Sequence, residues 1–458
     1  MHSIIKEMRE ETMRTSGTKA ILAGLTLAFA LAGCAGTAEP AATVAEMAEE
    51  TIAEPAAQQV EETTTEAPAQ ETAAQEAPTT TTAEPTQSYT AQVSELTGAT
   101  GGALAASDIF TERDLTQNAD LNGATTIALT SGQDVVISAE GVYVLQGSAE
   151  NVTVHVEAAD TDKVQLVLDG VSITNESAPA IYVKSADKVF VTTTESANVL
   201  AVTGAFVADG ETNLDAVIFS RSDIVLNGLG SLTISSTENG ISSKDDLKIT
   251  GGTLIVEATA DALEANDSVA ISGGDISVVA GKDGIHAEYD DGTGYVYVCG
   301  GTISVQAASD AIQGTELVQV DGGAIAVTAG EGIEATKVQI NGGSIDASCS
   351  DDGINASYKS GDTVPVLEIN GGELRVTMAQ GDTDALDSNG YFIINGGTID
   401  ISAQFPFDSD YGVEYNGGTI YVNGQQVTDI NSYLMMSPGG MGGMGGPGMM
   451  GAPGGPGF

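Results

Sequence analysis

A short pattern of apolar and polar residues recurs along the second half of the chain. Each copy opens with two glycines, continues with alternating apolar and small polar residues, and ends in an acid followed by a small and an apolar residue. The glycine pairs start at residues 251, 273, 300, 322, 342, 371, 396 and 417, so successive copies lie 20 to 29 residues apart. A unit this short cannot enclose a hydrophobic core alone and must stack on its neighbours. The pattern therefore predicts a solenoid.

The alternating segments predict β-strands. Segments such as 254–256 and 303–305 follow the glycines, and a second segment rich in β-branched residues precedes the next pair, as at 269–271 and 338–340. These segments are too short and too interrupted by glycine for helices, and helical repeats need about 34 to 47 residues per unit. We therefore expect an all-β fold, a single-stranded parallel β-helix with coils of about 22 residues. The glycine pair should mark a tight corner of each coil.

Residues 105–235 are also rich in strand-like segments, but they lack a regular period. We interpret them as irregular N-terminal coils of the same solenoid, closed by a cap near residues 108–121. A separate β-sandwich is the alternative. The strand candidates are residues 135–137, 152–156, 164–168 and 180–183.

Asparagine precedes four of the later glycine pairs, at Asn341, Asn370, Asn395 and Asn416. Because asparagines stacked at a corner can hydrogen-bond from coil to coil, we assign them a structural role rather than a binding role.

The first 33 residues have the features of a bacterial lipoprotein signal. Basic residues precede the apolar run 20–32, which is too short to cross a bilayer. The run ends in Leu-Ala-Gly-Cys, which resembles a lipobox, and this resemblance implies that Cys34 is lipidated and becomes the mature N-terminus. We therefore expect a lipid-anchored protein on the extracellular face of the bacterial cell membrane. A plain secretory signal is the alternative.

Composition divides the rest of the chain. Residues 34–92 contain 11 Glu and no Lys or Arg, and they predict a disordered spacer whose charges repel one another. Residues 434–458 are almost entirely Gly, Met and Pro and predict a disordered tail. The folded domain should therefore span residues 93–433. Its two cysteines, Cys299 and Cys349, fall at different positions of the repeat, so we expect buried thiols rather than a disulfide.

The net charge is −49, which excludes nucleic acid and anionic membrane surfaces as partners of the folded domain. Contact with a membrane should occur through the lipid anchor alone. An uncompensated charge of this size destabilises a compact chain, and bound cations would offset it.

Polar residues occupy two fixed positions of the repeat, three residues apart. The first column consists of Asp261, Asp283, Asp310, Glu331, Asp352 and Asp384, and the second of Glu264, His286, Gln313, Glu334, Asn355 and Asp387. The apolar residue between them should point into the core. Stacked coils lie about 4.8 Å apart, so the acids should form a ladder along the solenoid.

Such a ladder suits calcium, which takes oxygen ligands at roughly 2.4 Å, so that one ion between two coils can bind both carboxylates. Histidine and cysteine are scarce, which disfavours zinc and copper. We therefore expect bound Ca²⁺, while the alternative is that the acids only cap turns. The candidate ligands are Asp261, Glu264, Asp283, Asp310, Glu331, Glu334 and Asp352.

Three segments resemble a known family. They are FTERDL from Phe110, VQLVLDGVSITNESAPAIYVKSADKVFVTTTESANVL from Val164, and SKDDLKITGG from Ser243. They are similar to the bacterial carbohydrate-binding β-helix family of clostridial surface lipoproteins, whose members bind cellulose and acidic pectic polysaccharide. The resemblance covers residues 108–433. It implies a right-handed parallel β-helix, bound calcium, and a fold similar to that of calcium-dependent pectate lyases.

These observations favour a non-catalytic, monomeric polysaccharide binder, with pectic or cellulosic ligands. An acidic solenoid should repel polygalacturonate unless calcium is shared between protein and sugar. Aromatic stacking platforms are scarce: the chain has no Trp, and only a small group of tyrosines near two insertions could serve. That group is Tyr289, Tyr295, Tyr297 and Tyr358.

Two other functions remain open. A calcium-dependent polysaccharide lyase would need a base of lowered pKa, with Lys244, Lys282 and Lys359 as candidates, although ion pairing suits these lysines better. A passive adhesin or wall scaffold is the third possibility.

Overall fold

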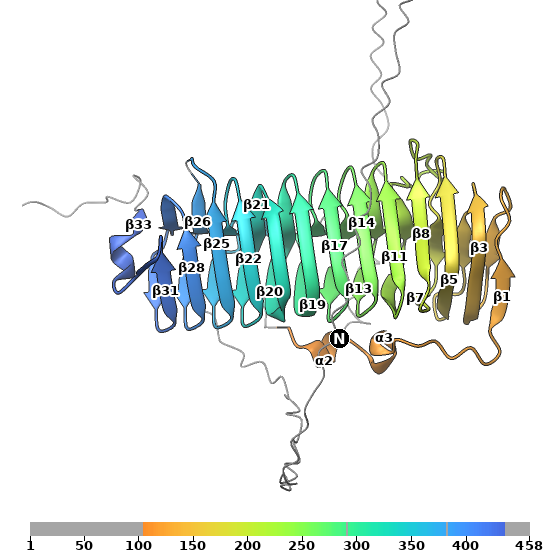
Figure 1. The fold of residues 1–458 in the computed structure, drawn as a ribbon, viewed down its shortest axis with the longest axis horizontal. Helices are drawn as coiled ribbons and strands as arrows, with labels where there is room; N and C mark the ends of the chain where they lie inside the picture. Colours follow the sequence, from red (N-terminus) through yellow and green to blue (C-terminus); the bar gives the residue numbers. More distant parts are fainter. Residues whose placement is uncertain (1–103, 290–291, 382, 436–458) are drawn as a thin grey trace, which may run out of the picture. The chain divides into compact units, whose positions relative to one another are not determined.

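The computed structural model describes residues 104–289, 292–381 and 383–435. These residues form an all-β parallel solenoid of about twelve turns (Figure 1). The strands of successive turns pair in parallel, with β31–β32 as the antiparallel exception among the strand pairs described. The predicted β-helix is therefore confirmed, and the β-sandwich alternative for residues 105–235 is wrong. The signal, Cys34, the spacer and nearly all of the tail lie outside the described residues.

Each turn contributes to three parallel ladders, which we name A, B and C. Ladder A precedes the glycine corner and contains β1 (Thr125–Ala128), the first parts of β3 (Gly141–Glu150) and β5 (Lys163–Asn175), β7 (Lys188–Thr193), β10 (Asp223–Gly228), β13 (Asp246–Ile249), β16 (Ser268–Ile271), parts of β19 (Tyr295–Ala307), β20 (Asp310–Ala329) and β21 (Glu331–Ile340), β24 (Val366–Ile369), β27 (Tyr391–Ile394) and β30 (Val413–Tyr415).

Ladder B follows the glycine corner. It contains the last parts of β3, β5, β19 and β20, together with β8 (Ala197–Val202), β11 (Ser231–Ser236), β14 (Thr253–Ala258), β17 (Asp275–Ala280), β22 (Ser344–Cys349), β25 (Glu373–Met378), β28 (Thr398–Ser402) and β31 (Thr419–Val422), which is extended by β32 (Gln425–Gln426).

Ladder C completes the turn and carries the acidic columns. It contains β2 (Val135–Ile137), β4 (Val154–Glu157), β6 (Ile181–Ser185), β9 (Ala216–Ser220), β12 (Asn239–Ser243), β15 (Leu263–Ala265), β18 (Ile285–Ala287), the first parts of β20 and β21, β23 (Ile354–Ala356), β26 (Asp384–Ser388), β29 (Phe405–Asp408) and β33 (Leu434–Met435), which follows a 3-10 turn at Ile430–Ser432.

The core is a set of stacked apolar columns, because strands in register place like residues above one another. In ladder C, the residue between the two polar columns is fully buried in every copy. The stack runs through Ile241, Leu263, Ile285, Ile312, Ile333, Ile354 and Leu386. The expectation that this position points inward is confirmed.

The two corner glycines have different reasons to be glycine. At Gly371, a Cβ would lie 2.6 Å from the Asn341 carbonyl oxygen of the preceding coil. At Gly372, the backbone has φ +84°, a left-handed conformation that disfavours side chains. The coil spacing and the turn geometry therefore each require one residue of the pair.

The asparagines before these glycines form the coil-to-coil ladder expected from the sequence. The side-chain amide of Asn370 donates to Asn341 Oδ1 at 2.8 Å, that of Asn395 donates to Asn370 Oδ1 at 2.7 Å, and that of Asn416 donates to Asn395 Oδ1 at 2.8 Å. The amides of Asn370 and Asn395 thus donate to the asparagine of the preceding coil and accept from that of the following coil.

The segment 104–124 does not cap the first coil, contrary to our expectation for residues 108–121. It carries two short helices, α2 (Ala106–Ile109) and α3 (Glu112–Leu115), and runs along the solenoid before reaching β1 at its end (Figure 1). Gln319 Nε2 donates to the Leu104 carbonyl at 2.9 Å, and Lys248 Nζ donates to the Ile109 carbonyl at 2.9 Å.

This strap (residues 104–124) stays on the flank of ladder A because it buries apolar and charged groups there. Ile109 and Phe110 form a small buried cluster with Ala270 and Tyr297. The fully buried carboxylate of Asp114 lies 3.4 Å from Lys188 Nζ. Within the described residues, no helix is long and apolar enough to span a membrane.

Candidate functional site

The two polar columns follow ladder C, as the repeat predicts. First-column residues lie at the corner that opens each ladder C strand. Second-column residues lie on the strand, one position before its buried end, as Glu264 does before Ala265. The register pairs Glu264 with His286, His286 with Gln313, and Gln313 with Glu334. The stack then continues through Asn355 to Asp387.

First-column aspartates do cap the corners. Asp261 Oδ1 accepts the backbone N–H of Asp283 at 3.0 Å, and Asp283 Oδ1 accepts that of Asp310 at 3.0 Å. Asp352 Oδ1 accepts the N–H of Asp384 at 3.1 Å. The turn-capping alternative is therefore correct for one oxygen of each of these carboxylates. The second oxygen of each of these carboxylates takes no part in the capping hydrogen bond.

Two groups of side chains along the columns bring three potential ligand atoms within 4.8 Å of one another. The oxygen cluster consists of Asp310, Glu331 and Glu334, and the histidine cluster consists of Asp261, Asp283 and His286. Both groups join residues from two adjacent coils. The structure thus gathers five of the seven predicted ligands, and it adds His286, which the sequence placed in the second column but not among the ligands.

The oxygen cluster combines buried carboxylates with few cations. Glu334 makes an ion pair with Lys359, accepts a hydrogen bond from Ser357 Oγ at 2.7 Å, and accepts another from Gln313 Nε2 at 3.1 Å. Glu331 accepts a hydrogen bond from Asn355 Nδ2 at 3.1 Å. Lys359 thus neutralises one of three carboxylates.

The ionisation of the oxygen cluster reflects this imbalance. Burial raises the pKa of Asp310 to about 8, with further repulsion from Asp283, Glu331 and Glu334. Burial raises the pKa of Glu331 to about 7, helped by repulsion from Glu334. Burial also acts to raise the pKa of Glu334, but the contact with Lys359 outweighs it and lowers that pKa.

One oxygen beside the cluster has no protein partner. Asn355 is buried, and its amide nitrogen points to the carboxylates of Glu331 and Asp352, at 3.1 and 3.4 Å. Its Oδ1 atom is buried without a hydrogen bond. A buried polar atom without a partner is costly in a folded protein, and a bound cation or water would satisfy it.

The histidine cluster is compensated from within. His286 Nδ1 lies 3.5 Å from Asp261 Oδ2 and 3.7 Å from Asp283 Oδ2. Burial acts to lower the pKa of His286, but the hydrogen bond to Asp261 and the charge of Asp283 raise it overall. Burial acts to raise the pKa of Asp261, yet its hydrogen bonds, led by that to His286, lower it. The imidazole of His286 thus lies beside both carboxylates, which favour its protonated form.

Two predicted ligands stand apart from both clusters. Glu264 lies 3.3 Å from Lys244 Nζ and accepts a hydrogen bond from Asn239 Nδ2 at 2.6 Å. Asp352 uses one oxygen on the Asp384 N–H and contacts Asn355 with the other. The sequence spacing placed Glu264 and Asp352 in the correct columns. It did not identify Lys244 and Asn239 as the partners of Glu264.

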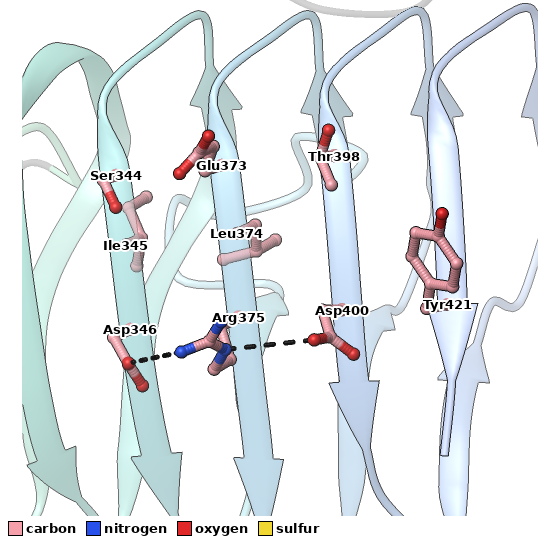
Figure 2. Close-up of a pocket in the computed structure, with 9 residues that line it drawn as sticks. All are labelled: Ser344, Ile345, Asp346, Glu373, Leu374, Arg375, Thr398, Asp400 and Tyr421. Atoms are coloured by element: carbon pink, nitrogen blue, oxygen red, sulfur yellow. Dashed lines mark ion pairs between the residues drawn. The ribbon is translucent and has the colours of Figure 1, made fainter. Parts of the chain in front are cut away.

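A shallow groove of about 370 Å³ lies on the outer face of ladder B, away from the columns. Figure 2 shows Arg375 between Asp346 and Asp400, with Tyr421 two strands away. The guanidinium lies 3.6 Å from Asp346 and 3.9 Å from Asp400. Since the arginine side chain is 63% exposed and already shared by two exposed acids, these ion pairs contribute little. Because the groove lies apart from the acidic columns, Arg375 is a control position for the experiments below and not a candidate binding residue.

Comparison with known proteins assigns the chain to a family. A protein of Acetivibrio thermocellus described as a carbohydrate-binding domain-containing protein is 36% identical over 167 residues, which make up 34% of this chain and 58% of that protein. The solved structure of the polysaccharide lyase-like protein from C. thermocellum, a gadolinium derivative, is 33% identical with a TM-score of 0.44, covering 48% of this chain and 96% of that one. Residues 131–385, more than half of the chain, match the family model described as carbohydrate-binding domain-containing protein. The chain therefore belongs to the carbohydrate-binding domain-containing family.

Proposed function

We propose that this protein is a lipid-anchored cell-surface protein that binds acidic polysaccharide through calcium held by the oxygen cluster. The observation that carries the proposal is the meeting of Asp310, Glu331 and Glu334 within 4.8 Å in a chain of a carbohydrate-binding family. Anchoring through Cys34 rests on the sequence alone.

The donor set of this cluster fits calcium. Ligand oxygens lie roughly 2.4 Å from the ion, so two oxygens on opposite sides are about 4.8 Å apart, the upper limit of this cluster. Asn355, whose amide nitrogen donates to Glu331, also carries a buried neutral oxygen without a hydrogen-bond partner. Bound calcium would compete with Lys359 for Glu334 and would offset the surplus charge of the cluster. The histidine cluster fits calcium less well, because imidazole nitrogen is a poor ligand for this ion.

Calcium also resolves the electrostatic problem of an acidic ligand. A protein of net charge −49 repels a polyuronate, and the repulsion becomes an attraction only where a cation is shared. The oxygen cluster lies where ladder C begins. Asp310 and Glu334 are buried and Glu331 is half-buried, so a sugar carboxylate would reach a bound ion on the side of Glu331.

A lyase is the alternative, and Lys359 argues against it. Burial acts to lower the pKa of Lys359, but the hydrogen bond to Glu334 and the charges of that residue and Asp310 raise it overall. A general base needs a lowered pKa to be free of its proton near neutral pH. Lys244, the second candidate, pairs with Glu264. Both lysines are thus suited to neutralising charge.

Calorimetry of the full-length protein with polygalacturonate tests the proposal, first with calcium and then with a chelator. We expect binding with calcium, no binding with the chelator, and no unsaturated product by ultraviolet absorbance. Asp310→Asn combined with Glu331→Gln should abolish binding, while Arg375→Ala in the ladder B groove should not change it. Product formation would make the protein a lyase. Absence of binding in both buffers would favour an adhesin or scaffold.

A further inference from the structure

Three tyrosines from three successive coils meet at the corner between ladders C and A. Tyr358 follows β23, Tyr391 opens β27 and Tyr411 follows β29. The hydroxyl oxygens of Tyr358 and Tyr411 lie 3.2 Å apart, and the rings of Tyr391 and Tyr411 pack edge to face with centroids 5.4 Å apart. The sequence pointed to Tyr358 as part of a platform, but the partners come from other coils.

The two outer tyrosines expose much of their surface. Tyr358 is 48% exposed and Tyr411 is 54% exposed. Tyrosine is a large apolar body with a polar end, and it gains from covering its ring while its hydroxyl stays hydrogen-bonded. Adjacent exposed rings with paired hydroxyls therefore present a surface suited to a flat partner that is apolar on its faces and polar at its edge.

Both tyrosines sit on corner loops that are held by hydrogen bonds. In the loop of Tyr358, Ser360 receives a bond at its backbone oxygen from Thr363 N at 3.2 Å, and its Oγ donates to the Gly292 carbonyl at 2.6 Å. The backbone N–H of Tyr411 donates to the Gly390 carbonyl at 3.1 Å. The backbone of both loops is thus held in place before any ligand arrives, which lowers the entropic cost of binding.

The charge around the tyrosines selects the partner. Asp410, which directly precedes Tyr411, acts electrostatically on Tyr358, and Asp408 lies close enough to interact with Asp410. The nearby cation, Lys359, pairs with Glu334. Such a surface repels a uronate, whereas carboxylates are strong acceptors for the hydroxyl groups of a neutral sugar.

We propose that Tyr358 and Tyr411 form a second carbohydrate subsite, which binds an uncharged pyranose chain without calcium. The apolar faces of the sugar rings cover the tyrosines, and the sugar hydroxyls donate to the exposed carboxylate of Asp410. The inference rests on the proposed polysaccharide-binding function but not on the oxygen cluster. One protein would then carry two subsites of different chemistry along the same ladder.

The test measures binding of cellohexaose and of polygalacturonate to the full-length protein, in calcium and in chelator. We expect cellohexaose binding to persist in chelator. Tyr358→Ala combined with Tyr411→Ala should weaken it at least about tenfold, since each aromatic contact contributes modestly, and should change polygalacturonate binding less than about twofold. Tyr415→Ala, at another exposed tyrosine, is the matched control and should change neither ligand.

Conservative variants separate stacking from folding. Tyr358→Phe combined with Tyr411→Phe keeps the rings and should retain most of the affinity for cellohexaose. Unchanged cellohexaose affinity in the double alanine variant would overturn the subsite, as would equal loss in Tyr415→Ala or binding that requires calcium. If the wild type bound polygalacturonate alone, this subsite would fail while the proposed function stood. If it bound neither glycan, both would fail.

Discussion

The histidine cluster and the oxygen cluster occupy equivalent places in the same ladder, yet they have opposite electrostatics. Each joins a first-column acid to an acid and a second-column residue of the next coil. In the first cluster the second-column residue is His286, and in the other it is Glu334. The pKa of Asp261 is lowered, whereas burial and neighbouring acids raise the pKa of Asp310 to about 8.

This difference shows that the residue types in the two columns decide what a repeated corner can bind, since Asp283 and His286 of one cluster correspond to Glu331 and Glu334 of the other. The two corners are capped differently. In the histidine cluster the N–H of Asp283 donates to Asp261 Oδ1 at 3.0 Å, whereas in the oxygen cluster the N–H of Glu331 donates to the Ser309 carbonyl oxygen at 3.1 Å. The histidine cluster carries its own cation and has little need for another. The oxygen cluster has one lysine for three carboxylates and therefore favours an added cation.

The largest expected effect is the response of stability to calcium. Calcium at about one hundred times its dissociation constant should stabilise the protein by about 2.7 kcal/mol, because it binds the folded state alone. Asp310→Asn combined with Glu331→Gln should remove this gain, measured by urea unfolding with and without calcium. Asp283→Asn is the control, because its amide oxygen can still accept the N–H of Asp310. A lost calcium response in the control would contradict the comparison.

The second effect is the pH dependence of stability in chelator. Asp310 and Glu331 have folded-state pKa values of about 8 and about 7, raised first by burial and then by neighbouring acids. Between about pH 4 and pH 8 the folded state therefore binds more protons than the unfolded state, and stability falls as pH rises. Urea midpoints at pH 5, 6, 7 and 8 should decrease in chelator, and calcium should flatten the slope. A midpoint that rises over this range would refute the assignment.

The third expected effect is a pH-dependent loss of stability when His286 is replaced. Its raised folded-state pKa means that the stability it contributes is present below about pH 6.5, its ordinary value, and is lost as pH rises through the folded value. His286→Gln should therefore destabilise the protein by about 1–3 kcal/mol at pH 5.5, the usual range for a hydrogen bond to a charged group. The loss should be much smaller at pH 9. An equal loss at both pH values would show that packing, not charge, is responsible.

The regular part of this fold could be predicted because each coil repeats the same physical requirements. The buried ladder C residue and the glycine pair recur in register, so a single-coil pattern locates them all. The strap could not be placed, because its contacts join residues as far apart as Leu104 and Gln319 and follow no period. The surface of ladder A on which the strap packs is formed only when the coils stack on one another.

The candidate site, like the fold, could be predicted from the sequence only where it follows the repeat. The columns follow from spacing, but their compensation depends on residues outside the repeat. Lys359 reaches Glu334 from an insertion, and Lys244 reaches Glu264 from the preceding coil. Tyr411 meets Tyr358 from a loop 53 residues later. No local pattern encodes these encounters.

The smallest expected effect is also the sharpest test of the comparison. His286→Glu would give the histidine cluster three carboxylates from two adjacent coils, as in the oxygen cluster, with Asp283 in the place of Glu331. It should destabilise the protein in chelator at neutral pH, because Asp261 and Asp283 lose their cation and gain a like charge. Calcium should then restore about 1 kcal/mol or less, the gain expected when the ion is present at a few times a weak dissociation constant. To separate this gain from that at the natural cluster, the substitution is made in the Asp310→Asn, Glu331→Gln background. His286→Gln in that background is the control and should show no calcium response. If both substitutions responded alike, the second-column residue would not decide cation binding, and the difference between the clusters would have to lie in the first column, where Asp283 corresponds to Glu331, or in the backbone.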